Sequence, residues 1–287
     1  MLVMNQHVLF MNSLTNKHIL NSVALALTED FGAGDVSADL LLEKTITAEI
    51  ISRESSVICG IEYAQSTFLS LDDKIKLDWK VKDGEHINSG QVLCILMGSS
   101  KAIISAERVA LNFLQMLSSV ATKTHYLVSK INHTNAQLLD TRKTIPGLRL
   151  AQKYAVKCGG GVNHRMGLYD CIMLKENHII ALDSITLAVK LAIQQHPNIP
   201  LIVEVEDLNQ LQEVLTLSGV SRVLCDNFPI SDLIQAVGMV KGKFPLEASG
   251  NINENTIVEV ANTGVDFIST GSITKHIQAI DFSLRFV

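Results

Sequence analysis

The chain has 287 residues, of which 47% are hydrophobic and 18% are charged, as expected for a globular protein with a substantial core. Its formal net charge of −5 and its pI near 6.0 argue against nonspecific binding to nucleic acid or to an anionic membrane. No apolar stretch reaches the ~18 residues of a membrane span, and the N-terminal segment is a poor signal peptide because it lacks a basic region. We therefore expect a cytoplasmic protein that binds neither nucleic acid nor membranes.

The first ~110 residues predict a small α+β domain. Apolar periodicity favours a helix over 17–30, and the turn-rich stretch EDFGAGDVSADLL follows it. Alternation over 46–60 predicts strand, a helix is expected over 63–70, and LDWKVKDGEHINSGQVLCILMGS is typical of strand, turn and strand. Its turns resemble those of lipoyl- and biotinyl-carrier sandwiches. The resemblance concerns architecture only, since no Lys lies at the hairpin that those carriers modify.

A long apolar-periodic helix is predicted from Ser105 onward, over SAERVALNFLQMLSSVATKTHYLVSKI, and we expect it to link two domains. Glu107, Arg108 and Asn112 lie on or near one of its faces. The five cysteines are odd in number and show no CxxC or zinc-site spacing, which predicts buried free thiols in a reducing compartment.

The remainder of the chain alternates short apolar runs with helix-like segments. Such alternation predicts a parallel sheet whose strands are buried on both faces, and this number of units favours a barrel over an open sheet. The runs are AQLLDTRK, CIMLKENH, LIVEVED, RVLCDNF, PLEASGNI and DFISTGSIT. The helices between them include ITLAVKLAIQQ, LNQLQEVLTLSG, ISDLIQAVGMV and NTIVEVANTG.

Polar residues and glycines stand where these runs end. The active sites of such barrels lie at the carboxyl ends of the strands, so we expect these residues to converge on one rim. The set is Arg142, Lys143, Lys175, Glu204, Asp226, Ser249, Gly250 and Gly271. Each has an ordinary structural interpretation by itself, such as a solvated basic turn, a helix cap or a surface lysine. A site is favoured because functional residue types recur at every strand end.

The chemistry of this rim indicates an anionic substrate. Arg142, Lys143 and Lys175, with Arg165 and the neighbouring His164, suit carboxylate or phosphate, and glycine turns after the last two strands suit phosphate. Glu204 and Asp226 need another role: they could hold Mg²⁺, accept hydrogen bonds from ribose hydroxyls, or stabilise developing positive charge. The chain contains no P-loop, dinucleotide fingerprint, HExxH or GxSxG motif.

Most of the chain resembles the quinolinate phosphoribosyltransferases, the decarboxylating nicotinate-nucleotide pyrophosphorylases of NAD biosynthesis. The matching stretches occur in the family's order: EDFGAGDVS, ERVALNFLQMLSSVAT, DTRKTIPGLR, KYAVKCGGGVNHRMGLYDCIMLKENHI, VEVED, LCDNF, EASGNI and ISTGSIT. The resemblance implies an N-terminal α/β sandwich domain over 1–117, completed by a C-terminal return over 273–287. It also implies an incomplete α/β (TIM-like) barrel of parallel strands over 118–272, and a homodimer or a multiple of dimers.

Carried over by position, the resemblance implies a role for each site residue. Arg142, His164, Arg165 and Lys175 would line the quinolinate pocket, and Arg108 would reach it from the partner subunit. Lys143 would contact phosphoribosyl pyrophosphate, and Glu204 and Asp226 would serve the ribose hydroxyls and a Mg²⁺ held largely through that substrate. Ser249, Gly250, Asn251 and Gly271 would bind the 5′-phosphate. Lys143, Lys175, Glu204 and Asp226 are the expected catalytic residues.

The implied reaction yields nicotinate mononucleotide, pyrophosphate and CO₂. Two alternatives stay open at this point. One is a related protein of the molybdenum-transport type on the same fold, with a different substrate. The other is a noncatalytic carrier or binding protein built on the sandwich domain.

Overall fold

The computed structural model describes the backbone of residues 2–287 and side chains from Asn16 onward. Its chain divides into two compact units. The first contains the residues up to Lys123, Ile145–Gly160 and Ile277–Val287, and the second contains Thr124–Thr144 and Gly161–His276. The predicted domain limits, 1–117 with 273–287 and 118–272, remain a prediction, because these units are groups of residues in contact and not segments shown to fold alone.

The first unit is built on an antiparallel sheet of four strands in the order β12-β1-β5-β3. The strands are β1 (Thr45–Ser52), β3 (Lys76–Trp79), β5 (Val92–Ser99) and β12 (Phe282–Phe286), and β2 (Ser56–Val57) pairs separately with β4 (His86–Ile87). Along β1, Ala48, Ile50 and Ser52 are buried while the residues between them are partly exposed. This two-residue period turns one face of the strand into the core.

Helices supply the rest of the first unit's core. They are α1 (Leu2–Phe31), which includes the predicted 17–30 helix, α2 (Ile61–Leu71), α3 (Ser100–Ile131) and α4 (Arg149–Cys158), with a short 3₁₀ turn at Ala38–Leu40. Phe68 of α2 and Leu111 and Leu114 of α3 pack in one cluster with Ile50 and Leu96 of the sheet. The helix that was predicted to begin at Ser105 begins five residues earlier, at Ser100. Its residues from Thr124 onward belong to the second unit.

The second unit is a sheet of six parallel strands in the order β6-β11-β10-β9-β8-β7. Each strand lies within one of the predicted apolar runs: β6 (Gln137–Leu139), β7 (Ile172–Leu174), β8 (Leu201–Val205), β9 (Arg222–Asp226), β10 (Leu246–Ser249) and β11 (Phe267–Ser269). Among the described residues β6 and β7 do not pair, so the sheet stays open. The predicted incomplete barrel of parallel strands is confirmed.

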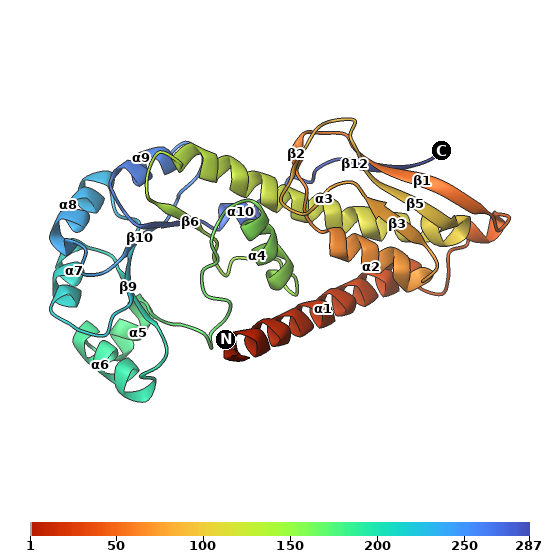
Figure 1. Cartoon of the computed structure of the whole chain (residues 1–287). Coiled ribbons are helices and arrows are strands. Elements are labelled where there is room, and N and C mark those ends of the chain that lie inside the picture. Colours follow the sequence, from red (N-terminus) through yellow and green to blue (C-terminus); the bar gives the residue numbers. More distant parts are fainter. Residues whose placement is uncertain (1) are drawn as a thin grey trace. The chain divides into compact units, whose positions relative to one another are not determined.

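Short helices connect these strands and follow the outer side of the curved sheet (Figure 1). They are α5 (Glu176–Ala181), α6 (Ile185–Gln195), α7 (Leu208–Leu215), α8 (Ile230–Val240) and α9 (Ile257–Asn262), while α10 (Ser272–Lys275) follows the last strand, β11. Local capping explains where some begin: Asp207 accepts hydrogen bonds from the backbone N–H groups of Asn209 and Gln210, both at 2.8 Å, at the start of α7. Strand and helix thus alternate as the sequence predicts.

Two further sequence expectations can be compared with the described residues. All five cysteines are free thiols; Cys59, Cys94, Cys171 and Cys225 are buried, whereas Cys158 is only partly buried. None of the described helices combines the length and the apolar character that crossing a membrane requires.

Candidate active site

A pocket of about 410 Å³ opens at the carboxyl ends of the strands in the second unit. Its size falls within the range that holds small-molecule ligands, roughly 300–1,000 Å³. The predicted rim residues that line it are Arg142, Lys143, His164, Arg165, Lys175, Glu204, Asp226 and Ser249. They come from segments far apart in the sequence, and parallel strands bring them together because their carboxyl ends share one edge.

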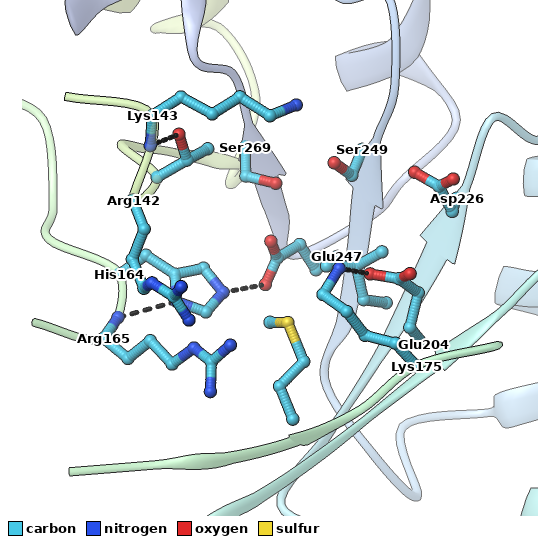
Figure 2. Close-up of a pocket in the computed structure, with 13 residues that line it drawn as sticks. Arg142, Lys143, His164, Arg165, Lys175, Glu204, Asp226, Glu247, Ser249 and Ser269 are labelled. Atoms are coloured by element: carbon cyan, nitrogen blue, oxygen red, sulfur yellow. Dashed lines mark hydrogen bonds and ion pairs between the residues drawn. The ribbon is translucent and has the colours of Figure 1, made fainter. Parts of the chain in front are cut away.

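One side of the pocket carries two guanidinium groups. Figure 2 shows the side chains of Arg142 and Arg165 on the same side of the hollow. Burial lowers the pKa of Arg165, and the nearby positive charge of Arg142 lowers it further. The positive charges of Arg142 and Arg165 repel each other. An anion bound between them would relieve that repulsion and accept hydrogen bonds from both guanidinium groups.

Two carboxylates hold the loop that presents His164 and Arg165. The buried Asp140 accepts hydrogen bonds from the His164 backbone N–H at 2.9 Å and from the Asn163 amide at 2.6 Å. Asp170 accepts from the backbone N–H groups of Met166 at 2.6 Å and Gly167 at 3.0 Å. Arg165 itself donates from Nη1 to the carbonyl of Cys171 at 3.0 Å. The loop has little regular structure, and these hydrogen bonds take the place of the backbone hydrogen bonds that a strand or helix would supply.

The opposite side of the pocket carries acidic groups. Glu204 is the last residue but one of β8 and forms an ion pair with Lys175, and Asp226 ends the neighbouring strand β9 (Figure 2). Asp226 accepts a hydrogen bond from the side-chain amide of Asn227 at 2.8 Å. The pocket therefore presents cations to one part of a ligand and carboxylates to another.

These two carboxylates suit a magnesium ion only in part. No group of three His, Cys, Asp or Glu side chains able to hold a metal occurs among the described residues. Mg²⁺ usually takes one or two protein carboxylates and completes its shell with water and substrate phosphates. Glu204 and Asp226 fit that arrangement, in which the substrate brings the remaining oxygen ligands.

A second hollow of about 310 Å³ adjoins the first and shares Lys143 and Ser249 with it. The predicted Gly250, Asn251 and Gly271 line this hollow. Gly250 has a φ of 102°, and a Cβ there would lie 2.2 Å from Oδ1 of Asn227. Only glycine fits this turn, which brings the backbone close to the hollow as phosphate binding requires.

Glu247 lines the pocket and was missed by the sequence reasoning. Its side chain is fully buried in β10, where Arg222 donates to Oε2 at 2.9 Å and His164 Nε2 lies 3.4 Å from the same oxygen (Figure 2). The prediction considered only residues at the ends of apolar runs, and Glu247 lies inside one. A charged residue within a buried strand was the available signal, since such a group needs partners.

Arg108 is the one predicted site residue that lines neither hollow of the second unit. It lies on α3 in the first unit and is exposed. Burial raises the pKa of its neighbour Glu107, and the charge of Arg108 lowers it in part. The described residues thus leave Arg108 accessible to a binding partner.

Family models match both parts of the chain. The model described as "Quinolinate phosphoribosyl transferase, C-terminal domain" matches residues 120–285, and that for the N-terminal domain matches residues 35–118. The chain belongs to the quinolinate phosphoribosyltransferase family. The predicted family is confirmed, and the parallel sheet with the site at its carboxyl edge corresponds to the family's C-terminal domain.

Curated relatives and a solved structure agree with this membership. The chain is 37% identical over 276 residues to the "Probable nicotinate-nucleotide pyrophosphorylase [carboxylating]" of Bacillus subtilis, covering 96% of this chain and 94% of the relative. It is 36% identical over 284 residues to "Quinolinate phosphoribosyltransferase [decarboxylating] 1b" of Nicotiana tabacum, covering 92% and 81%. The nicotinate-nucleotide pyrophosphorylase structure from Francisella tularensis superposes with a TM-score of 0.93 at 44% identity, covering 95% of this chain and 97% of that one.

Proposed function

We propose that this quinolinate phosphoribosyltransferase acts in NAD biosynthesis by transferring phosphoribosyl from phosphoribosyl pyrophosphate to quinolinate with decarboxylation. The observation that carries the proposal is one pocket with two guanidinium groups on one side, two strand-end carboxylates on the other, and a glycine-lined hollow beside it. The guanidinium groups suit a dicarboxylic acid, the carboxylates suit the hydroxyls of a ribose, and the glycine-lined hollow suits a phosphate. The names of the relatives at 36–37% identity support the same activity.

In the proposed binding mode Arg142, Arg165 and Lys175 take the two carboxylates of quinolinate. Quinolinate and phosphoribosyl pyrophosphate are both anions and repel each other in water, and the cations offset that repulsion while they orient the ring nitrogen toward ribose C1. His164 contributes a further polar contact from its buried ring. Lys143, which lines both hollows, contacts the phosphates.

The other half of the proposed site holds the phosphoribosyl group. Ser249, Gly250, Asn251 and Gly271 surround the 5′-phosphate, and Glu204 and Asp226 accept hydrogen bonds from the ribose hydroxyls. The same two carboxylates are the groups that would hold Mg²⁺ together with oxygens of the substrate. That ion, when bound, supplies positive charge that offsets the charge of the leaving pyrophosphate.

The reaction then proceeds by displacement at ribose C1. The ring nitrogen forms a bond to C1 as the bond from C1 to the pyrophosphate oxygen breaks, and positive charge develops on the sugar in the transition state. Glu204 and Asp226 stabilise that charge. The product ring nitrogen is cationic, so it accepts the electron pair that the 2-carboxylate leaves behind when CO₂ departs, and a proton then adds at that carbon.

We further propose a homodimer, or a multiple of dimers, in which Arg108 completes the pocket of the partner subunit. The exposure of the Arg108 side chain on α3 supports this assignment. The cytoplasmic localisation expected from the sequence remains a prediction.

Product analysis with quinolinate, phosphoribosyl pyrophosphate and Mg²⁺ tests the proposed activity. We expect equal amounts of nicotinate mononucleotide, pyrophosphate and CO₂, with the CO₂ derived from the 2-carboxylate of labelled quinolinate. Nicotinate is the matched control, because it leaves one cation without a carboxylate partner and should react at least roughly 10²-fold more slowly in kcat/KM. Comparable kcat/KM for the two acids would contradict the assignment of the cations, and the absence of product from quinolinate would contradict the activity. The related molybdenum-transport type predicts that second outcome.

A further inference from the structure

The tautomer of His164 follows from its hydrogen bonds. The backbone N–H of Arg165 donates to Nδ1 of His164 at 2.6 Å. A backbone N–H can only donate, so Nδ1 keeps its lone pair. The proton of the neutral ring therefore lies on Nε2, the other nitrogen, and this nitrogen faces Glu247 (Figure 2).

Glu247 is an acceptor at a suitable place for that proton. Its Oε2 lies 3.4 Å from Nε2 of His164, and both side chains are almost completely buried, with exposed fractions of 0% and 6%. Water has little access to either group, so the orientation of the ring depends on the protein groups around it. Glu247 and the Arg165 N–H hold the imidazole from opposite sides.

Arg222 keeps Glu247 in the form that accepts hydrogen bonds. Burial by itself raises the pKa of this carboxyl, but the close contact with His164 and hydrogen bonds from Ser269 and Arg222 outweigh burial and hold the pKa below its ordinary value. The guanidinium of Arg222 also lies 4.0 Å from the centre of the Phe267 ring. The positive charge of Arg222 offsets the negative charge of the Glu247 carboxylate. Glu247 therefore does not repel an anion bound in the pocket.

We propose that Glu247 is a positioning residue for His164: its carboxylate fixes the ring with the proton on Nε2, so that the ring meets the bound aromatic acid in one orientation. This inference rests on the proposed function, since it places His164 against quinolinate. It assigns Glu247 a role in affinity for the acid, with no contact to the phosphoribosyl group.

Two substitutions of Glu247 separate this role from simple charge pairing. Glu247→Gln keeps an amide oxygen that accepts from Nε2 but loses the charge, and Glu247→Met removes both. We expect KM for quinolinate to rise about threefold in the first and at least about tenfold in the second, with KM for phosphoribosyl pyrophosphate changed by less than about twofold. Equal effects of the two substitutions would overturn the proposal, because they would mean that only the charge of Glu247 matters and not its ability to accept a hydrogen bond.

A double-mutant cycle with His164→Ala tests whether the effect passes through the ring. When the imidazole is absent, Glu247→Met should change KM for quinolinate by less than about twofold. An undiminished effect in that background would show that Glu247 acts by another route. If His164→Ala alone leaves KM for quinolinate unchanged, the placement of His164 against the acid fails, and this inference fails with it.

Nitrogen-15 NMR of the unliganded protein gives a readout that does not depend on activity. The His164 signals should show a protonated Nε2 and an unprotonated Nδ1 in the wild type and in Glu247→Gln. In Glu247→Met the ring should lose its single orientation, and its signals should broaden or shift. A proton on Nδ1 in the wild type would overturn the inference even if the enzyme makes product, whereas a protein with the expected tautomer and no product would contradict only the proposed function.

Discussion

The two units each contain a carboxyl group with a shifted pKa, and the two shifts have opposite directions. In the first unit Asp83 accepts hydrogen bonds from the Ile61 N–H at 3.2 Å and the Tyr154 hydroxyl at 3.0 Å, and burial still raises its pKa. In the second unit Glu247 is more deeply buried, yet its pKa is lowered. Glu247 contacts His164 and also pairs with the charged Arg222, whereas neutral donors alone only partly replace the water that an ionised carboxylate loses. The second unit thus keeps a buried carboxyl group in its charged form. A site that binds anionic substrates likewise has to hold charged groups away from water.

The largest expected effect tests whether the two units form one active site across a dimer. Arg108→Ala in the first unit and Lys175→Ala in the second should each be almost inactive as pure homodimers. Refolding equal amounts together should restore about a quarter of wild-type activity, since about half of the randomly paired C₂ dimers are mixed and one of their two pockets is intact. Steady-state assays on the refolded mixture measure this, and mixed dimers separated by affinity tags should show about half of wild-type activity.

Mixed dimers without recovered activity would show that Arg108 does not act in the partner's pocket. A wild-type sample refolded with an inactive double variant, Arg108→Ala with Lys175→Ala, is the control for losses during refolding.

The next effect concerns chemistry within the second unit. Glu204→Gln and Asp226→Asn should lower kcat by about 10²–10³-fold, because each removes negative charge that stabilises the sugar in the transition state. The KM for quinolinate should change much less. Initial rates over both substrate concentrations separate the two parameters. A change confined to KM in both variants would reassign these carboxylates to binding.

A matched pair of glycines compares the two units at the level of the backbone. Gly250 in the second unit has a φ of 102° and its Cβ position meets Asn227, whereas Gly90 in the first unit has a φ of 82° and no atom within 4 Å of its Cβ position. Gly90→Ala should cost about 1 kcal/mol in free energy of unfolding from backbone strain alone. Gly250→Ala should cost about 2–3 kcal/mol and raise KM for phosphoribosyl pyrophosphate about tenfold.

Urea unfolding and KM measurements check both glycine variants. Equal losses of stability would mean that Asn227 moves aside without cost, and an unchanged KM in Gly250→Ala would argue against a phosphate in that hollow.

The smallest effect is the pH dependence of stability, which should have opposite signs in the two units. Folding lowers the pKa of Glu247 from 4.5. Its contribution to the free energy of unfolding is therefore present above pH 4.5 and is lost as the pH falls through the lowered pKa. Folding raises the pKa of Asp83 from 3.8, so stability falls as the pH rises from 3.8 through the raised pKa.

Substitution by the uncharged amide isolates each contribution. Glu247→Gln should make the loss of stability in acid less steep, and Asp83→Asn should make the fall toward neutral pH less steep. Thermal unfolding midpoints at a series of pH values measure both. Slopes that change in the same direction in the two variants would contradict the comparison.

Much of the second unit was predictable because its strands are short, apolar and regularly spaced. Runs such as LIVEV and RVLCD are typical of strands buried on both faces, and the polar residues near their ends marked the edge of the sheet where the pocket opens. The first unit was harder to delimit: α3 begins before the predicted residue, and α4, which lies between β6 and β7 in the chain, belongs to the first unit. Local patterns specify an element but not which core it joins.

The sequence by itself determined the alternation of strands and helices, the family, and which charged residues stand at strand ends, because these depend on periodicity and on motifs read along the chain. Only the tertiary structure decided the partners of those residues. Lys175 pairs with Glu204, and Glu247 lies between His164 and Arg222. Such contacts join residues separated by tens of positions, and they arise from strand order and register, which no local pattern contains.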